Sequence, residues 1–355
     1  MAKKLFIPGP VSVAPEVLDK LATPIIGHRG KEASELQKSI THKLQKLFFT
    51  KEEILLSTSS GSGLMEGAIR SCTGKRAAVF SIGAFGKRWF EMAQSNQVQA
   101  DLFEQEWGKA TSAEQVEQVL KTGKYDLITI THNETSTGVM NPLASIAQAV
   151  KKYPDVIFCV DAVSSMGGSK IETDTLGIDI CITSTQKSLG LPPGFSVCTF
   201  SAKAAARAEK VPFRGYYFDL LSLYDYIKTK DYQYSSTPSL PHMFALDYQL
   251  DRILAEGIEN RYCRHQEMAE MVREWAVKNY SLFADSDYLS DTVTVINNTR
   301  NIDISELNKE LGCRGYQIAN GYGKMKDKTF RIAHMADYTI EDIANLLKNI
   351  DDILN

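Results

Sequence analysis

The chain has 355 residues, with 40 lysine and arginine side chains against 43 aspartate and glutamate side chains and a net charge of −3. Because no long block of like charge is present, this balance argues against a protein that binds nucleic acid or another polyanion. No window offers the roughly 18 consecutive apolar residues of a membrane span, and the length suits one large domain with a smaller one.

The six cysteines predict a reducing compartment. None stands in CxxC spacing, and three lie inside apolar, strand-like runs. Such residues are typical of buried free thiols and not of metal ligands or disulfides. The N-terminus, MAKKLFIPGP, reaches prolines after three apolar residues, which is too few for the apolar core of a signal peptide. We therefore expect a cytoplasmic protein.

The N-terminal part begins with the turn-rich segment LFIPGP and a short helix from about Pro15, a residue that the first turn of a helix tolerates. A second helix is predicted by apolar residues at helical spacing, namely Leu36, Ile40, Leu44 and Leu47.

Alternating β-rich runs and helices follow. EEILLSTSSGSGLMEGAIRSC and RAAVFSIGAFGKRW each read as strand, glycine-containing turn and helix, and YDLITITHNETSTGVMNPL leads through a helix at about 143–152 to VIFCVDA. This alternation predicts an α/β fold with a mostly parallel, doubly wound sheet. In the first unit, N–H groups at the helix N-terminus and nearby hydroxyls are suited to hold a phosphate. The GSG turn alone is neither a Walker loop nor GxGxxG.

Two strand ends in the middle of the chain carry chemically useful side chains. The apolar run 156–160 stops at Asp161, and the run 178–182 is followed by Ser-Thr-Gln-Lys, which ends in Lys187 and leads to a PPG cluster. The carboxyl ends of strands are where ligands bind in open α/β sheets. Taken singly, Asp161 is more typical of a helix cap and Lys187 of a solvated loop.

Together, these residues resemble the fold-type-I pyridoxal phosphate (PLP) enzymes, and most closely the class-V aminotransferases of the alanine–glyoxylate and serine–pyruvate type. The resemblance implies that Lys187 forms a Schiff base with the cofactor aldehyde and that Asp161 holds the pyridine nitrogen protonated. It covers nearly the whole chain and is strongest from Ser59 to Gly194.

The resemblance also assigns the other cofactor residues. It places Ser62, Gly63 and Leu64 on the phosphate, Phe85 against the pyridine ring, and Thr135, Val163 and Gln186 in the cofactor site. Most relatives of this type have tryptophan where this chain has Phe85, whose alternative interpretation is core packing. NETSTG matches the HxExSTG element of the family, in which Gly138 allows the turn, and the PGP segment near the N-terminus is expected close to the site.

A strand and a helix from about Ser201 follow Lys187, and then comes a tyrosine-rich segment. In the resembled family, the YxxT pair in this place reaches across a dimer interface. We therefore expect a homodimer in which Tyr234 and Thr237 bind the phosphate of the neighbouring subunit's cofactor. Ordinary core packing is the alternative interpretation of the tyrosines.

The pattern changes at about Gly257. A long charged helix (258–278) precedes a strand in DTVTVI, a helix in ISELNKEL, a hairpin-like pair of strands in GYQIANGYGKMKDKTFRIAHM, and a last helix with Thr339 as N-cap. We predict a large PLP-binding domain at 15–256 and a smaller α+β domain built from 1–14 and 257–355.

Arg331 is the expected contact for the substrate carboxylate. An arginine pairs bidentately with a carboxylate, and the resembled family has its carboxylate-binding arginine in an RIGxxG-like segment at this distance from the C-terminus. Here Ala333 and His334 stand where glycines are usual. Without the resemblance, Arg331 would be interpreted as a surface charge.

The expected reaction is ping-pong transamination from alanine or serine to glyoxylate or pyruvate, with Lys187 moving the proton. The main alternative is a phosphoserine aminotransferase, in which His28 and Arg29 would contact the substrate phosphate. A cysteine desulfurase is disfavoured because neither Cys263 nor Cys313 has the SGSAC-like context of a mobile nucleophile. A non-catalytic PLP-binding relative would have no use for the lysine and aspartate pair.

Overall fold

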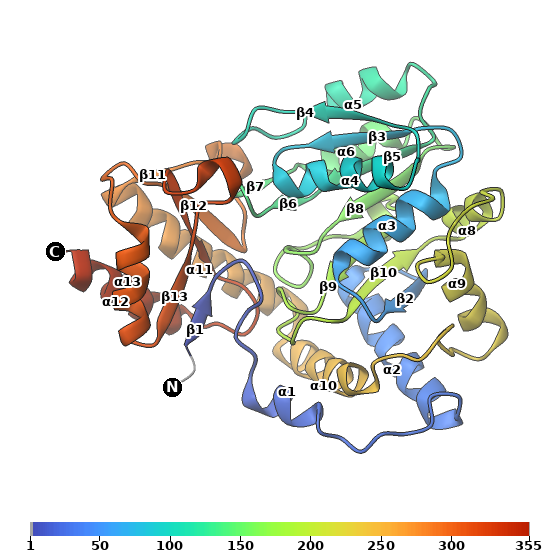
Figure 1. Cartoon of the computed structure of the whole chain (residues 1–355), viewed down its shortest axis with the longest axis horizontal. Helices are drawn as coiled ribbons and strands as arrows, with labels where there is room; N and C mark the ends of the chain where they lie inside the picture. Colours follow the sequence, from blue (N-terminus) through green and yellow to red (C-terminus); the bar gives the residue numbers. More distant parts are fainter. Residues whose placement is uncertain (1–2, 355) are drawn as a thin grey trace.

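The computed structural model describes residues 3–354, in which two β-sheets form the centres of two adjoining lobes (Figure 1). The larger sheet has the strand order β2 (Glu53–Ser57), β10 (Ser196–Phe200), β9 (Ile180–Ser184), β8 (Ile157–Asp161), β5 (Leu127–Thr131), β3 (Ala77–Ser81) and β4 (Ala100–Glu104). Neighbouring strands are parallel, except that β10 runs antiparallel to both β2 and β9. The predicted mostly parallel sheet is therefore confirmed.

Helices cover both faces of this sheet. One face shares an apolar cluster with α2 (Lys31–Phe48), α5 (Ala113–Leu120), α6 (Leu143–Val150) and α10 (Leu240–Glu256). The other face packs on α3 (Gly61–Cys72), α4 (Ala84–Ser95), α8 (Ala202–Ala208) and α9 (Leu220–Thr229). In β3, Ala78 and Phe80 belong to the first cluster, and Ala77 and Val79 to the second. Strands buried on both faces are continuous apolar runs in sequence.

The smaller sheet combines both ends of the chain. Its order is β1 (Lys4–Phe6), β13 (Tyr316–Asn320), β14 (Thr329–Ala333), β12 (Val293–Asn297) and β11 (Ser281–Leu282). Three helices pack on it, namely α11 (Ile258–Asn279), α12 (Ile304–Cys313) and α13 (Ile340–Leu354). Because β1 pairs with β13, we propose the division into 15–256 and 1–14 with 257–355. Residues 1, 2 and 355 of that division lie outside the described residues.

Short elements connect these parts. They are α1 (Pro15–Lys20), α7 (Thr173–Leu176), the hairpin of β6 (Asn133–Glu134) and β7 (Val139–Met140), and the 3-10 helices η1 (Ser286–Tyr288) and η2 (Gly323–Met325). The hydroxyl of Thr339 accepts a hydrogen bond from the N–H of Asp342 at 3.2 Å, as expected for the predicted helix cap. Within residues 3–354, no helix has both the length and the apolar character needed to cross a membrane.

The strand directions decide where polar side chains can meet. β2, β3, β5, β8 and β9 all point the same way. The residues that follow them therefore come together at one edge of the sheet, where open α/β sheets bind their ligands.

Candidate active site

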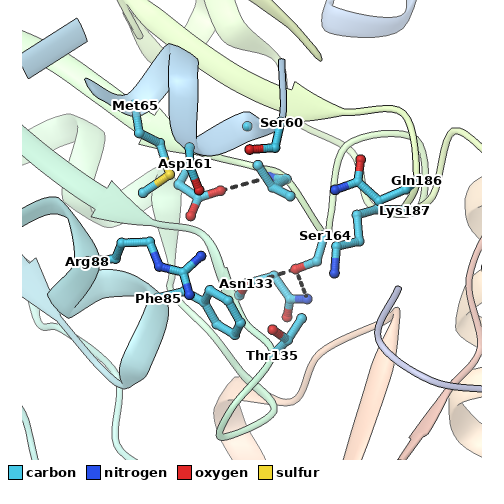
Figure 2. Close-up of a pocket in the computed structure, with 13 residues that line it drawn as sticks. Ser60, Met65, Phe85, Arg88, Asn133, Thr135, Asp161, Ser164, Gln186 and Lys187 are labelled. Carbon is cyan, nitrogen blue, oxygen red and sulfur yellow. Dashed lines mark hydrogen bonds between the residues drawn. The ribbon is translucent and has the colours of Figure 1, made fainter. Parts of the chain in front are cut away.

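A cavity of about 210 Å³ lies at this edge of the larger sheet. Figure 2 shows Asp161 and Lys187 on opposite sides of it. The predicted site residues on its wall are Ser62, Phe85, Thr135, Asp161, Val163, Gln186 and Lys187. The wall also contains Ser60, Gly61, Met65, Arg88, Asn133 and Ser164.

Asp161 is the last residue of β8 and is buried. Burial raises the pKa of this carboxyl to about 6, and the nearby charge of Glu134 acts in the same direction. The N–H of Val163, which donates to Oδ1 at 2.9 Å, opposes the rise, as do the charges of Lys187 and Arg88. A cation bound directly against the carboxylate would return it to the charged state.

Lys187 follows β9 and is half-buried. Burial lowers the pKa of its amine to about 8, the charge of Arg331 lowers it further, and Asp161 opposes the shift. The amine donates a hydrogen bond to the carbonyl oxygen of Pro8. Gly9 lies against the same side chain, because a Cβ there would be 2.5 Å from Cδ of Lys187. The expectation that the PGP segment lies near the site is confirmed.

The turn between β2 and α3 supplies hydroxyls and backbone N–H groups. Ser60 is the N-cap of α3, and Gly61 and Ser62 open its first turn on the cavity wall. Among the described residues, none accepts a hydrogen bond from the N–H of Gly61 or Ser62. Free N–H groups at a helix N-terminus are suited to an anion.

Gly63 and Leu64 were also assigned to the phosphate. The structure places neither on the cavity wall. The N–H of Gly63 donates to the carbonyl of Ser60 at 2.9 Å, and the side chain of Leu64 is buried in the apolar cluster of α3. Any contact of theirs with a phosphate stays a prediction.

Phe85, in the first turn of α4, forms an aromatic part of the wall. The guanidinium of Arg88, one turn further on, lies 4.7 Å from the centre of its ring, and the ring of Tyr322 lies at 5.2 Å from it. Tyr322 belongs to the loop between β13 and β14. A flat aromatic face at this place is suited to stack on another ring.

Arg331 in β14 lies beside the cavity without lining it. Its Nε donates to the carbonyl of Asn320 at 2.9 Å and its Nη1 to the carbonyl of Thr135 at 3.2 Å. Burial lowers the pKa of this guanidinium to about 10. Against the motif RIGxxG, Ala333 and Ala336 stand at the two glycines and His334 at an unspecified position. His334 is buried, with Nδ1 paired with the carbonyl of Asp291 and Nε2 with the hydroxyl of Thr294. The neighbouring strand β12 thus accommodates the side chain of His334.

Besides Gly63, Leu64 and Arg331, four more predicted residues lie away from the cavity wall of this chain: His28, Arg29, Tyr234 and Thr237. Arg29 donates to the carbonyls of Tyr234 and Ser236. The Tyr234 hydroxyl accepts a hydrogen bond from the N–H of Thr58 at 3.2 Å, so it lies at the turn between β2 and α3 of the same chain. Because a single chain is described, contacts of these residues with a neighbour's cofactor or with a substrate stay predictions.

Sequence reasoning missed Arg88, Asn133 and Ser164. Arg88 stands three residues after Phe85, a spacing that places both on one side of α4. Asn133 precedes Glu134 in NETSTG, and its Nδ2 donates to the hydroxyl of Ser164 at 2.8 Å. The helical spacing could have indicated Arg88, whereas the pairing of Asn133 with Ser164 depends on the approach of two loops.

The aminotransferase class-V family model matches residues 20–346. The chain belongs to the class-V aminotransferase family. An uncharacterized aminotransferase of Methanocaldococcus jannaschii is 38% identical over 94% of this chain and 88% of its own length. A serine–glyoxylate aminotransferase of Methylorubrum extorquens is 31% identical over 94% of this chain and 86% of its own length. The crystal structure of an alanine–glyoxylate aminotransferase from Nostoc sp. superposes with a TM-score of 0.93 at 25% identity, covering 100% of this chain and 96% of that one.

This class-V enzyme is therefore a PLP-dependent aminotransferase of fold type I, which transfers an amino group between an amino acid and a 2-oxo acid. The cavity fits the cofactor. It offers a carboxylate at one end, a lysine amine of lowered pKa at the other, an aromatic wall, and free N–H groups at a helix N-terminus. These are the groups that a pyridine nitrogen, an aldehyde, a flat ring and a phosphate require.

Proposed function

We propose that this aminotransferase moves the amino group of a small amino acid, alanine or serine, to glyoxylate or pyruvate by a ping-pong reaction. The observation that carries the proposal is the pair of Lys187 and Asp161, which face each other across one cavity. The choice of substrates is supported by the names of the serine–glyoxylate and alanine–glyoxylate aminotransferases that the chain resembles.

The large-domain residues would hold the cofactor. Asp161 would pair with the ring nitrogen of the cofactor. Its pKa is raised because the carboxylate is buried without a cation directly beside it, so contact with a cationic ring nitrogen would favour the charged form. The first-turn N–H groups of α3 and the hydroxyls of Ser60 and Ser62 receive the phosphate. Phe85 and Val163 contact the ring. Bound PLP supplies the electron sink for the chemistry.

Lys187 is the covalent anchor and the proton carrier. At a pKa of about 8, roughly a tenth of its amine is neutral at pH 7, whereas a solvated lysine is almost fully protonated. Once an amino donor has replaced it, the amine can take the proton from the donor's α-carbon. The carbonyl of Pro8, to which the amine donates, keeps it directed to one side of the cavity.

Arg331 would bind the substrate carboxylate. Its hydrogen bonds to Asn320 and Thr135 use Nε and Nη1, and none of the described residues accepts from Nη2. Two fixed donors hold the guanidinium plane, which orients a bound carboxylate and so aligns the bond to be broken.

We also propose a homodimer in which Tyr234 and Thr237 approach the partner's cofactor. Exposed aromatic side chains near α3 support it, since Phe213 is 87% and Tyr216 93% exposed, and large exposed apolar groups that cluster mark protein interfaces. Sedimentation velocity should give the mass of two chains, and a fully active monomer would contradict the dimer.

The free cysteines support the predicted cytoplasmic location.

The alternatives find less support. Arg29, which motivated a phosphoserine substrate, uses its donors on the carbonyls of Tyr234 and Ser236. The two exposed cysteines, Cys263 and Cys313, lie in the helices α11 and α12. A desulfurase needs its nucleophile on a mobile loop, which neither position provides.

A panel of amino donors tests the proposal. Each donor is mixed with the PLP-loaded enzyme, and the loss of the visible absorption band is followed before glyoxylate or pyruvate is added. We expect alanine or serine to remove the band and the oxo acid to restore it. Lys187→Ala should show neither change. A kcat/KM for phosphoserine that is tenfold or more above that for serine, or sulfide release from cysteine, would contradict the proposed substrates.

A further inference from the structure

Glu134, in the segment NETSTG, is a buried carboxylate that the proposed mechanism leaves without a role. Its side chain is 0% exposed. Oε2 accepts hydrogen bonds from the N–H groups of Phe85 and Gly86, both at 2.9 Å. Oε1 accepts from the N–H of Ser136 at 3.1 Å and from its hydroxyl at 2.6 Å. All four donors are neutral, so these contacts bring no opposite charge to the carboxylate.

Two of these donors begin α4, the helix that presents Phe85 to the cavity. First-turn N–H groups have no partner within a helix, and a carboxylate satisfies them and interacts favourably with the helix dipole. Gly83, just before the helix, allows the approach, because a Cβ there would lie 2.5 Å from Cγ of Glu134. The chain then continues into Thr135, whose carbonyl accepts from Arg331 at 3.2 Å. One carboxylate therefore connects the start of α4 with the segment that contacts Arg331.

We propose that Glu134 is a positioning residue of the cofactor site. It holds the first turn of α4 so that Phe85 lies flat against the cofactor ring, and its negative charge favours the protonated state of cationic groups around the cavity. The inference rests on the proposed function, because it requires PLP to be bound at Lys187.

The charge of Glu134 acts on Asp161 in the cavity wall and on Arg331 beside the cavity. Burial is the main cause of the raised pKa of Asp161, and Glu134 adds to it. Burial lowers the pKa of Arg331 to about 10, and Glu134 opposes that shift. A charge in the interior is weakly screened and influences neighbours beyond contact distance. Removing it should lower the pKa of the cation that forms when Lys187 binds the cofactor.

The informative variant is Glu134→Gln. A glutamine keeps the shape and one acceptor, but its NH2 group must face N–H or O–H donors, and the charge is lost. Asp303→Ala is the matched control, because alanine removes the capping oxygen. Asp303 caps α12, away from the cavity, and its Oδ1 accepts from the N–H groups of Ser305 at 2.9 Å and Glu306 at 3.0 Å. Both variants weaken a helix cap, whereas only one removes a charge beside the cavity.

Three readouts separate positioning from simple helix capping. They are the thermal midpoint of the cofactor-free protein, the pH titration of the visible absorption of the PLP-loaded protein, and its visible circular dichroism. We expect both variants to lower the thermal midpoint by a few degrees. Only Glu134→Gln should move the titration to lower pH, by about one unit, and weaken the dichroism. If Glu134→Gln changes the thermal midpoint alone, as the control does, the proposal is overturned.

If Glu134→Gln does not fold, Ser136→Ala tests the positioning role of Glu134 instead. The Ser136 hydroxyl donates to Glu134 and accepts from the N–H of Ala84 at 3.1 Å, so its removal loosens the contact while the charge remains. We expect weaker visible dichroism with a titration midpoint close to that of the parent. Unchanged dichroism would overturn the positioning role. A parent enzyme that fails to bind PLP or to transfer amino groups would instead contradict the proposed function.

Discussion

Asp161 is a carboxylate whose charged form is disfavoured until a cation binds beside it. Burial raises its pKa to about 6 in the folded chain, against about 3.9 in an unfolded one. Folding therefore favours the protonated form of this carboxyl. Its contribution to stability is fully present below about pH 4 and is lost as the pH rises through about 6. The cofactor-free protein is destabilised by the group that its chemistry requires.

Asp161→Asn should stabilise the cofactor-free protein and abolish transamination. An asparagine has no charge to bury and keeps an acceptor for the N–H of Val163. At pH 9, where Lys187 is largely neutral, we expect the free energy of unfolding to rise by an amount on the order of 2 kcal/mol, and the gain to vanish below about pH 4. Urea unfolding at both pH values measures it. Asp155→Asn, at the exposed opposite end of β8, should change stability by less than about 0.5 kcal/mol.

A less stable Asp161→Asn protein at pH 9 would show that the carboxylate is paired in the free enzyme. If the Asp161→Asn variant kept its transaminase activity, Asp161 would not have the role assigned to it at the ring nitrogen. Each outcome concerns a single side chain, because the substitution changes neither the length nor the branching of Asp161.

At the scale of elements, the N-terminal segment lies against the lysine of the site, as its PGP motif indicated. It leaves the smaller sheet after β1 and continues to α1, which packs beside α10 (Figure 1). The N–H of Val11 donates to the carbonyl of Gln186 at 3.1 Å, and the carbonyl of Pro8 accepts from Lys187. Gly9 sits between these contacts with a φ of +95°, a conformation that side chains disfavour.

Gly9→Ala should slow the attachment of PLP by tenfold or more. The new methyl group would lie 2.5 to 2.8 Å from the end of Lys187, so the lysine must move away. The rate of appearance of the visible band after PLP is added measures this. Gly123→Ala is the matched control, because Gly123 has a φ of +69° and nothing within 4 Å of the added carbon.

Both glycine variants carry the backbone cost of a positive φ, about 1 kcal/mol, and both should unfold slightly earlier than the parent. Equal rates of PLP attachment in the parent and in Gly9→Ala would show that the N-terminal segment moves aside without displacing Lys187.

At the scale of the whole molecule, Asp337 links the two sheets. It follows β14 and accepts hydrogen bonds from Gln249 and Arg252 of α10 and from Arg261 of α11. The buried Arg261 also donates to the carbonyl of Ser188, directly after Lys187, at 2.8 Å. Burial alone would raise the pKa of Asp337, but Arg261, Gln249 and Arg252 together hold it below its usual value. This network joins the lysine loop to the strand of Arg331.

Asp337→Asn should destabilise the enzyme by about 3 kcal/mol at pH 7, because it leaves buried arginines without their carboxylate. Because the pKa of Asp337 is depressed in the folded protein, its carboxylate contributes fully to stability only above about pH 4. The difference in the free energy of unfolding between the variant and the parent should shrink as the pH falls through the folded-state pKa of Asp337. Denaturant unfolding at pH 7 and pH 3.5 tests this. Asp352→Asn, on the exposed surface of α13, should stay within about 0.5 kcal/mol of the parent. An equal loss in both variants would rule out the network.

The site was predicted from sequence to different extents at different positions. Asp161 and Lys187 were singled out because each follows an apolar run, and parallel strands place such ends at one edge; their roles came from the family resemblance. Arg331 was assigned through the family motif alone, and the structure places it beside the cavity through its contact with Thr135. His28 and Arg29 formed a suggestive pair, but the use of Arg29 depends on carbonyls more than 200 residues away.

The sequence by itself determined the alternation of strands and helices, the family, and the two residues on which PLP chemistry depends, because these follow from local patterns of apolar side chains and short motifs. The tertiary structure alone decided which distant segments close the cavity. Pro8 at Lys187, Glu134 at the start of α4, and Asp337 at Arg261 are contacts between parts of the chain far apart in sequence. Their geometry, and the pKa values that burial and neighbouring charges produce, exist only once the two sheets have packed together.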